Sequence, residues 1–430
     1  MEDIIIIGAG PSGLMAAIQA SYLGASVTVL ERNDKPLKKL YATGNGRCNF
    51  SNLYMDEKVY RGRDPEFALK LIEDYDRNDL LLFFHNLGMM TKHIGDYIYP
   101  YNEQARTVAD ALLLECRRLK VRVRCNEKAV DITYNNSFTV KTNDHEYKGR
   151  KLIVSAGGKA SPVHGSDGNL NMIIEGLGID FLPLRRALVP LTYTDKALSK
   201  LAGVRIKCSV NLIVDGKKAA GEQGEIIINK DNLSGIPIMQ MSRYATQALD
   251  EGSLVSVSID LFPDEDKDGV NRLIYNAFKG YRYGAAVMGR EPEKTDARYD
   301  RTSLEALSLL INEKLSLYCL NLTGILPDDL SANVNDKKLK ILADLLKDMR
   351  VAVKGDAGWE RAQVTAGGVD TRGLSEDLES VKVPGLYFTG ELCDIDGTCG
   401  GYNLQWAFSS GAVAGRGAAG KVRKEKNKGS

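Results

Sequence analysis

Residues 4–31 constrain the fold more than any other part of this 430-residue chain. The isoleucine run at 4–7 predicts a buried parallel strand, residues 14–23 predict a helix, and residues 27–30 predict a second strand that ends at Glu31. The turn between the first strand and the helix reads Gly-Ala-Gly-Pro-Ser-Gly. A strand, a glycine-rich turn, a helix and a strand in this order are typical of a dinucleotide-binding βαβ unit.

The glycines of this turn have separate roles in such a unit. Gly8 permits the tight turn, Gly10 lets the main chain approach a pyrophosphate, and Gly13 lets helix and strand pack closely. The N–H groups of the first helical turn point at the phosphates, and Glu31 can accept hydrogen bonds from a ribose diol. We therefore expect a dinucleotide here, although the turn alone does not distinguish FAD from NAD.

Length and charge narrow the class of protein. One hydrophobic core rarely serves more than about 250–300 residues, so we expect two or three domains. The 57 basic and 56 acidic residues leave a net charge of +1, which argues against a general nucleic-acid or membrane-surface role. No apolar run approaches the ~20 residues of a membrane helix. We expect a cytoplasmic protein with a small-molecule substrate and no nucleic-acid or membrane partner, and the oligomeric state stays open.

Cysteine and histidine usage gives no sign of a disulfide framework or a metal centre. The chain has seven scattered cysteines, an odd number, and four histidines that form no paired ligand motif. We therefore expect free thiols and no metal site. The basic run at 421–428 predicts a solvated, disordered tail.

A second informative segment covers residues 38–52, KKLYATGNGRCNFSN. Its glycine, asparagine and serine content predicts a loop, and its basic residues suit an anionic cofactor. A connecting loop that is merely polar is the alternative.

The residues up to 185 have the order expected of the first part of an FAD domain. Helices are predicted at 66–90 and 105–119, and strands at 121–125, 129–134, 138–142 and 151–155. The last of these strands enters the pair Gly157–Gly158. An ordinary turn at a strand end is the alternative for that pair.

Residues 186–359 carry no nucleotide motif and predict an inserted substrate or cap domain. The insert is β-rich over 186–263, with strands at 210–214, 225–228 and 254–261, and mostly helical over 264–350, with helices at 304–317 and 339–349. We expect this domain to cover the active site.

The third informative segment lies near the end of the chain. Residues 383–391 predict a turn and a strand that enters Gly390 and Glu391, and Gly400–Gly401 precede a helix over 402–414. The helix N-terminus can place N–H groups at the flavin N1/C2=O edge, which gains negative charge on reduction. Glu391 can bond ribitol or ribose hydroxyls, although the helix could also simply pack on the sheet. We expect 1–185 and 360–430 to form one discontinuous FAD domain.

The residues expected to contact FAD come from these segments and from the strand ends. They are Gly8, Gly10, Pro11, Ser12, Gly13, Glu31, Arg32, Lys39, Thr43, Gly44, Gly46, Arg47, Cys48, Asn49, Val130, Ala156, Gly157, Gly158, Gly390, Glu391, Gly400, Gly401, Tyr402, Asn403 and Leu404.

Five segments resemble a bacterial flavoprotein family that includes aminoacetone oxidase and dehydro-bile-acid reductase. They cover residues 8–17, 43–52, 224–245, 364–369 and 385–415. The resemblance implies an α/β fold: a two-part Rossmann-like FAD domain of the glutathione-reductase type, with an inserted β-barrel-like and helical substrate domain. The chain departs from the family pattern at 370–380, where relatives tend to carry a Thr-Met pair, at Asn45, where glycine is frequent, and at Cys393 and Cys399.

The resemblance also implies hydride transfer through flavin N5 of a non-covalent FAD. We expect NAD(P)H, bound transiently over the flavin, to drive reduction of an enone-type C=C bond. The chain has a single GxGxxG motif and so no second nucleotide domain, which suits the alternative of an oxygen-dependent oxidase of a small amine such as aminoacetone. A second alternative is a non-catalytic flavin-binding redox sensor.

No catalytic proton donor stands out. The candidates are Tyr281, Arg282 and Tyr283 in the insert and Cys48 in the segment at 38–52, with Tyr193 and Arg243 as further options. Each of these residue types is more often a packing or surface residue.

Overall fold

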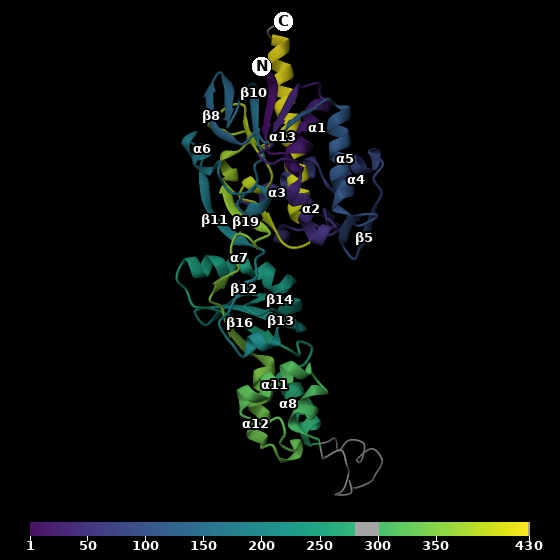
Figure 1. Cartoon of the computed structure of the whole chain (residues 1–430), viewed down its shortest axis with the longest axis vertical. Helices are drawn as coiled ribbons and strands as arrows, with labels where there is room; N and C mark the ends of the chain where they lie inside the picture. Colours follow the sequence, from purple (N-terminus) through teal and green to yellow (C-terminus); the bar gives the residue numbers. More distant parts are fainter. Residues whose placement is uncertain (280–300, 429–430) are drawn as a thin grey trace. The chain divides into compact units, whose positions relative to one another are not determined.

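The computed structural model describes residues 1–279 and 301–428 (Figure 1). It divides into two compact units, the first made of Met1–Ala187 and Gly358–Ser430, the second of Leu188–Ala357. The catalytic candidates Tyr281, Arg282 and Tyr283 lie outside the described residues.

Unit 1 is built on a seven-stranded sheet with the order β7-β2-β1-β10-β9-β8, and β20 pairs with β10. The strands are β1 (Glu2–Ile7), β2 (Val27–Leu30), β7 (Arg122–Arg124), β8 (Ala129–Asn135), β9 (Ser137–Thr142), β10 (Glu146–Val154) and β20 (Leu386–Phe388). The strands β7, β2, β1, β10 and β20 run parallel, whereas β9 and β8 form an antiparallel meander. The isoleucine run of β1 is buried at the centre, as its pattern predicts.

Two helices from opposite ends of the sequence pack against each other in unit 1: α1 (Pro11–Tyr22) and α13 (Tyr402–Lys428) (Figure 1). The contact depends on glycine. A Cβ at Gly411 would lie 2.2 Å from the Ser12 carbonyl oxygen, and one at Gly415 would lie 2.3 Å from that of Ala16. The α1 helix also contacts α5 (Ala105–Arg118). This packing joins the N-terminal βαβ unit to the C-terminal segment.

Two predicted helices are each divided in the structure. Residues 66–90 form α3 (Pro65–Asp74) and α4 (Arg77–Asn86), because Asp76 caps the second helix by accepting a 2.8 Å hydrogen bond from the Asp79 N–H. In the same way, residues 304–317 fall into α10 (Ser303–Ser308) and α11 (Glu313–Thr323), where Asn312 is the N-cap. In each case a polar N-cap residue inside the apolar period begins a new helix.

The segment at 38–52 is more ordered than the loop that its composition predicts. It contains α2 (Lys38–Ala42), a 3-10 turn at Thr43–Gly46 and β3 (Ser51–Asn52). The β3 strand pairs with β6 (Tyr97–Pro100), which pairs with β5 (Thr91–Ile94). The remaining elements of unit 1 are β4 (Tyr60–Arg61), α6 (Asn171–Gly176), β11 (Phe181–Ala187), β19 (Val364–Val369) and β21 (Asp396–Gly397).

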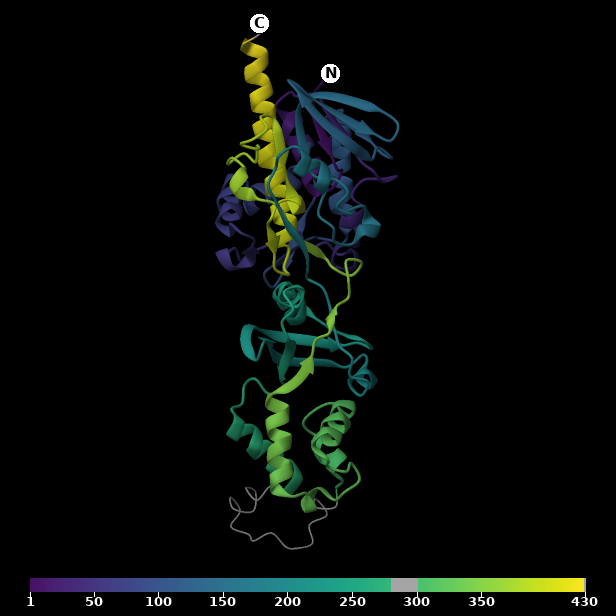
Figure 2. The same cartoon turned by 90° about the vertical axis from the view of Figure 1, so that its left-hand side faces the viewer.

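The prediction of a disordered basic tail was wrong, because α13 continues through Lys428 (Figure 2). Val422 is 2% exposed and packs in the core. Lys421 pairs with Asp377 at 2.9 Å, and Lys426 pairs with Asp3 at 2.7 Å. Lys421 and Lys426 are thus paired with residues distant in the sequence, and the segment is helical although residues 423–428 remain exposed to solvent.

Unit 2 has its own sheet and its own hydrophobic core. The strand order is β17-β16-β13-β14-β15-β12-β18. Its elements are β12 (Leu191–Thr192), β13 (Arg205–Val214), β14 (Lys217–Ile228), β15 (Asn232–Ser234), α7 (Ile236–Asp250), β16 (Val255–Asp260), α8 (Lys267–Lys279), α10, α11, α12 (Asp336–Lys347), β17 (Met349–Ala352) and β18 (Gly355–Asp356). The segment 349–356 pairs with β16 through β17 and with β12 through β18, so it joins the two edges of this sheet. The barrel-like form of the insert stays a prediction.

Within residues 1–279 and 301–428, no helix combines the length and the apolar character needed to cross a membrane.

Candidate cofactor site

The glycine turn lies where β1 and β10 end, at the carboxyl edge of the parallel strands. Gly8 has φ +102°, and a Cβ there would lie 2.3 Å from the Ser155 carbonyl oxygen. A Cβ at Gly13 would lie 2.0 Å from the Gly8 carbonyl oxygen. Around Gly10, in contrast, no neighbouring atom lies within 4 Å of that position. Gly8 and Gly13 are needed for packing, and Gly10 leaves the main chain open to a phosphate.

Glu31 holds this turn in shape. Its Oε2 accepts a 2.9 Å hydrogen bond from the Ala9 N–H, and its Oε1 accepts from the N–H and the side-chain amide of Asn33 at 2.9 and 2.8 Å. The residue is 6% exposed. Because each carboxylate oxygen can accept more than one hydrogen bond, a ribose diol is still compatible with Glu31. Arg32 pairs with Asp167, and this ties the end of β2 to the segment after β10.

A polar network joins three of the predicted segments. The carboxylate of Glu391 contacts Lys39 Nζ at 2.6 Å and accepts from Thr365 Oγ1 at 2.8 Å. Thr365 Oγ1 in turn accepts from the N–H of Lys159 at 2.7 Å, and a Cβ at Gly158 would lie 2.3 Å from it. Sequence reasoning did not select Thr365, although it lies in the segment 364–369 that carries part of the family resemblance.

Gly390 and the start of α13 are also connected. Gly390 has φ +66°, its N–H donates to Ser410 Oγ at 3.0 Å, and its carbonyl accepts from Trp406 Nε1 at 2.9 Å. A Cβ at Gly390 would lie 2.7 Å from Ser12 Oγ. These contacts fix the end of β20 against both α1 and α13.

A pair of glycines precedes the N-terminus of α13 and packs closely against residues 49–52. Gly400 and Gly401 have φ +135° and +91°, and a Cβ at Gly401 would lie 2.5 Å from the Ser51 carbonyl oxygen and 2.7 Å from Asn49 Oδ1. Asn52 Nδ2 donates a 2.8 Å hydrogen bond to the Gly400 carbonyl. The N–H groups of the first turn have no acceptor within the helix. They are therefore available to an anionic or acceptor-rich edge of a ligand.

The Asn49 side chain carries the clearest sign of a ligand. Its Oδ1 is buried and has no hydrogen-bond partner among the described residues. Buried acceptors are almost always satisfied, so this oxygen indicates a donor supplied from outside the chain. Flavins carry N–H donors in their ring system. Together with the open approach at Gly10 and the first-turn N–H groups of α13, Asn49 shows that the residues present fit FAD.

For the other residues expected to contact FAD, no contact among the described residues tests that role. The turn at 43–46 is left-handed at Gly44, Asn45 and Gly46, and asparagine tolerates this conformation, so Asn45 fits a position where the family resemblance makes glycine the expected residue. Arg47 pairs with Glu103 rather than with another residue of the site. Val130 has an exposed side chain in β8. Pro11, Ala156, Gly157 and Leu404 lie at the ends of the elements described above, and their roles towards FAD stay predictions.

The structure gives Cys48 the environment of a core residue. Its side chain is fully buried and packs in the hydrophobic core of unit 1, and burial raises the pKa of the thiol to about 12. Tyr193, in unit 2, donates a 2.5 Å hydrogen bond to the Asn229 carbonyl. Cys393 is fully buried, whereas Cys399 is partly exposed next to Gly400. Among these, Cys399 directly precedes the glycine pair at 400–401.

The fold and this site define a Rossmann-type dinucleotide-binding protein. The family described as "HI0933-like protein Rossmann domain" matches residues 2–417, and the chain belongs to this family. It is a FAD-dependent oxidoreductase.

Several curated relatives match over nearly their whole length. The chain is 34% identical to a 3-dehydro-bile acid delta(4,6)-reductase of Clostridium scindens, over 97% of this chain and 99% of the relative. It is 30% identical to a ribosomal RNA dihydrouridine synthase of Escherichia coli, over 95% and 96%. Among solved structures, a 3-ketosteroid delta1-dehydrogenase of Sterolibacterium denitrificans matches with 14% identity and a TM-score of 0.49, over 98% of this chain and 99% of that chain.

Proposed function

We propose that the protein reduces a carbon–carbon double bond conjugated to a carbonyl group, with NAD(P)H as the reductant. The name of the Clostridium scindens relative describes a reductase. Dihydrouridine, named in the Escherichia coli relative, is uridine whose conjugated ring double bond is reduced. The two names share one chemical step, which is the step we propose here.

The observation that carries the proposal is the start of α13. Bound FAD would supply the hydride transfer. The main-chain N–H groups of 401–404 would face the edge that becomes negative on reduction, because they have no acceptor in the helix. A helix N-terminus stabilises a nearby negative charge by about 0.3–1 kcal/mol, and by up to about 2 kcal/mol when partly buried. Asn49 Oδ1 would accept a flavin N–H.

An anaerobic pair of half-reactions tests the proposal. NADPH or NADH is mixed with the oxidised holoprotein, and the flavin spectrum is expected to bleach. Addition of a conjugated enone is then expected to restore the oxidised spectrum, whereas the matching saturated ketone is not. If neither nicotinamide reduces the flavin within seconds and aminoacetone does, the protein is an amine oxidase and the proposal fails.

Uridine in ribosomal RNA is a second candidate substrate, favoured by the 30% identity to the Escherichia coli relative. The absence of a nucleic-acid partner, expected from the net charge of +1, stays a prediction. Reoxidation of the reduced enzyme by a uridine-containing RNA, compared with a steroid enone, separates the two candidates.

A further inference from the structure

A small antiparallel sheet in unit 1 presents a row of tyrosines. In β6 and the residue after it, Tyr97, Tyr99 and Tyr101 alternate with Ile98 and Pro100. Ile98 is buried, whereas Tyr97 and Tyr99 are half-buried and Tyr101 is 60% exposed. Because side chains alternate along a strand, Tyr97 and Tyr99 point away from the core on one face of the sheet.

Two cations lie over this row. Arg47 Cζ is 5.0 Å from the centre of the Tyr99 ring, and Lys92 Nζ is 5.7 Å from that of Tyr101. Lys92 is the direct cross-strand partner of Tyr99, so the two share a face. The side chains of Arg47 and Lys92 are 49% and 34% exposed. Aromatic rings interleaved with cations are the usual elements of a surface that stacks bases and holds phosphates.

Glu103 shows that a single anion can engage both cations. Its Oε1 lies 2.6 Å from Lys92 Nζ, and its Oε2 contacts Arg47. These two hydrogen bonds lower the pKa of the Glu103 carboxyl. Glu103 has φ +53°, a left-handed conformation that is uncommon for a residue other than glycine. The carboxylate therefore marks a position where an oxyanion is held between Arg47 and Lys92.

This face begins at the candidate cofactor site. Asn52 is the cross-strand partner of Tyr97, and its side-chain amide donates to the Gly400 carbonyl at 2.8 Å. Arg47 lies two residues before Asn49, whose Oδ1 is next to Gly401. The row of tyrosines thus begins beside the glycine pair at the start of α13.

We propose that the face formed by Arg47, Lys92, Tyr99 and Tyr101 binds a nucleotide, with the base stacked on a tyrosine and a phosphate held between the two cations. The proposal rests on the proposed function and names the part of the molecule that takes the nucleotide. That nucleotide is the adenosine part of NAD(P)H, the reductant of the proposed function, and its phosphate competes with Glu103 for the same cations. Binding of an RNA nucleotide instead is an outcome of the test that would overturn this assignment.

Because Glu103 competes with the phosphate, substitutions at Lys92 and at Glu103 should shift the apparent Kd of the ligand in opposite directions. Lys92→Gln removes a phosphate contact, and we expect the apparent Kd for its ligand to rise roughly 5–10-fold, the loss of one charge-assisted hydrogen bond. Glu103→Gln removes the competing carboxylate, and we expect the same Kd to fall several-fold. Lys70→Gln is the matched control, since Lys70 is an exposed lysine of α3, outside this face.

The holoproteins are compared in stopped-flow reduction by NADPH and by NADH. Opposite shifts of the apparent Kd in Lys92→Gln and Glu103→Gln, with an unchanged limiting rate and FAD content, assign the face to the reductant. Binding of a uridine-rich single-stranded oligonucleotide, followed by fluorescence anisotropy, is measured on the same proteins. Opposite shifts confined to the oligonucleotide assign the face to an RNA substrate and overturn the assignment to NAD(P)H.

Binding of ADP to the oxidised holoprotein, measured by calorimetry, separates this proposal from the proposed function because it needs no turnover. If NADPH and NADH fail to reduce the wild-type flavin while ADP responds to the two variants, the face stands and the proposed function fails. If no ligand responds to either variant, or both respond as Lys70→Gln does, the face does not bind a nucleotide.

Discussion

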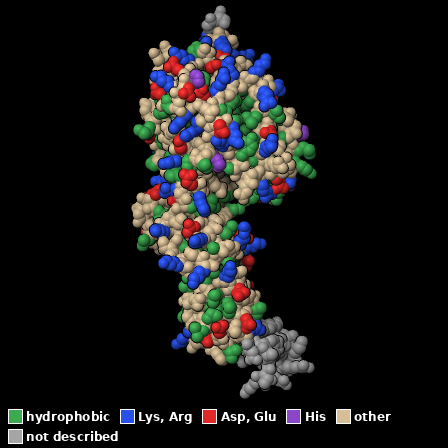
Figure 3. All heavy atoms as spheres, in the orientation of Figure 1, with side chains coloured by type: hydrophobic (Ala, Val, Ile, Leu, Met, Phe, Trp, Pro, Cys, Tyr) green, Lys and Arg blue, Asp and Glu red, His purple; other side chains and the backbone are tan. Residues whose placement is uncertain are grey.

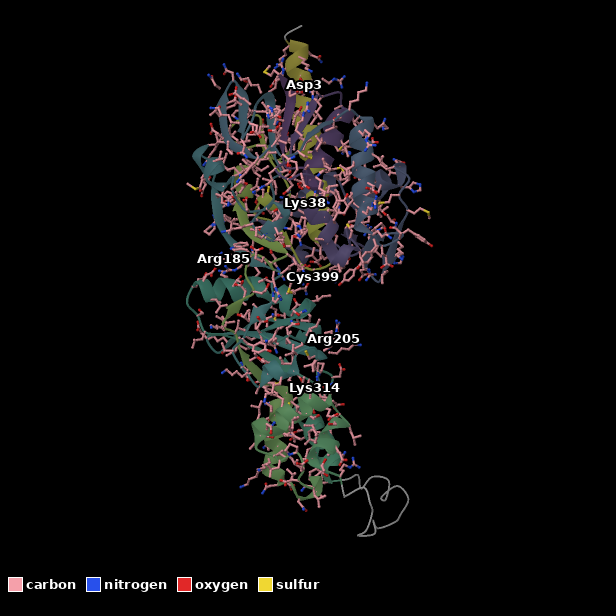
Figure 4. All side chains as sticks on the ribbon, viewed as in Figure 1. Asp3, Lys38, Arg185, Arg205, Lys314 and Cys399 are labelled. Carbon is pink, nitrogen blue, oxygen red and sulfur yellow. The ribbon has the colours of Figure 1, made fainter. Side chains whose placement is uncertain are left out.

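The polar groups described at the two ends of α13 differ in whether they have partners within the chain. At its start, Gly400 and Gly401 hold left-handed backbone, the first-turn N–H groups lack helix acceptors, and Asn49 Oδ1 has no donor among the described residues. Near its other end, Lys421 and Lys426 pair with carboxylates from elsewhere in unit 1. Figure 4 shows Asp3 and Cys399, which mark these regions, at opposite ends of unit 1. Acidic and basic side chains mingle around the far end of the helix (Figure 3).

From this difference we infer that the two ends of α13 have different roles. Polar groups without partners cost stability unless a ligand supplies the missing hydrogen bonds, which supports our proposal that the start of α13 binds the cofactor. Near the far end, Lys421 and Lys426 have carboxylate partners within unit 1, and the pair with Asp3 ties α13 to β1. Changes at the start should therefore alter cofactor binding, and changes at the far end should alter stability alone.

The largest effect is expected at Gly401. A Val side chain there would combine a φ of +91° with a Cβ 2.5 Å from the Ser51 carbonyl oxygen, so Gly401→Val should give protein without bound FAD. The measurement is the ratio of released FAD to protein. Gly420→Ala, in the same helix with no atom within 4 Å of its Cβ, should keep FAD and gain about 0.4–1 kcal/mol of unfolding free energy. A yellow Gly401→Val protein with a full complement of FAD would contradict this role.

A smaller effect on FAD binding is expected from a substitution at Asn49. Asn49→Leu removes the unpaired acceptor at similar volume, so FAD should dissociate about tenfold more readily, as for the loss of one hydrogen bond of about 1–1.5 kcal/mol. The protein stripped of FAD should not lose stability, because the variant no longer buries an unsatisfied oxygen. Fluorescence titration of FAD and urea unfolding of the stripped protein measure the two quantities. Equal FAD affinity in the variant would remove Asn49 from the site.

Asp3 should make the far end sensitive to acid. Burial raises the pKa of the Asp3 carboxyl, but hydrogen bonds from Lys426 and Ser26 outweigh burial, and the pKa is lowered. A carboxyl with a lowered folded-state pKa stabilises the fold above its unfolded pKa of about 3.9 and loses this contribution as the pH falls through the folded value. Asp3→Asn should therefore lose less stability than wild type between pH 6 and pH 3 in urea unfolding, with FAD affinity at pH 7 unchanged. Identical losses in both proteins would rule out the linkage.

The smallest effect is expected at Lys421, whose side chain is 37% exposed. Lys421→Met should cost about 0.2–1 kcal/mol at low salt, and less at high salt, because exposed ion pairs are weak and screened. Urea midpoints at two ionic strengths measure the difference, and the FAD content should stay at the wild-type level. Loss of FAD in this variant would show that the two ends are coupled.

The sequence predicted the parts of this molecule that depend on local pattern. The first βαβ unit, its glycines and the start of α13 follow from strand and helix periodicity and from residues that suit a tight turn. The continuation of α13 could not be predicted in this way, because its charges are paired with Asp3 and Asp377, which are distant in the sequence.

The parts of the site that the sequence did not predict also depend on contacts between residues distant in the sequence. Thr365 joins Glu391 to the main chain at Lys159 through contacts that no local period reveals. The divided helix at 66–90 is the exception, because Asp76 with Asp79 forms a readable capping box. The alternation of Tyr97, Tyr99 and Tyr101 was also present in the sequence, but the register of β3, β6 and β5 was needed to show which face it occupies.

The glycine contact between α1 and α13 also bears on the order of folding. Gly411 and Gly415 place α13 against the main chain of Ser12 and Ala16, so the first βαβ unit completes its packing only after α13 has been synthesised. During translation, part of the apolar surface of unit 1 therefore stays uncovered until unit 2 and then α13 have been synthesised. Contacts between such distant segments slow folding and lengthen the time in which chaperones are needed. FAD would then be captured late, by a chain whose α13 has already docked.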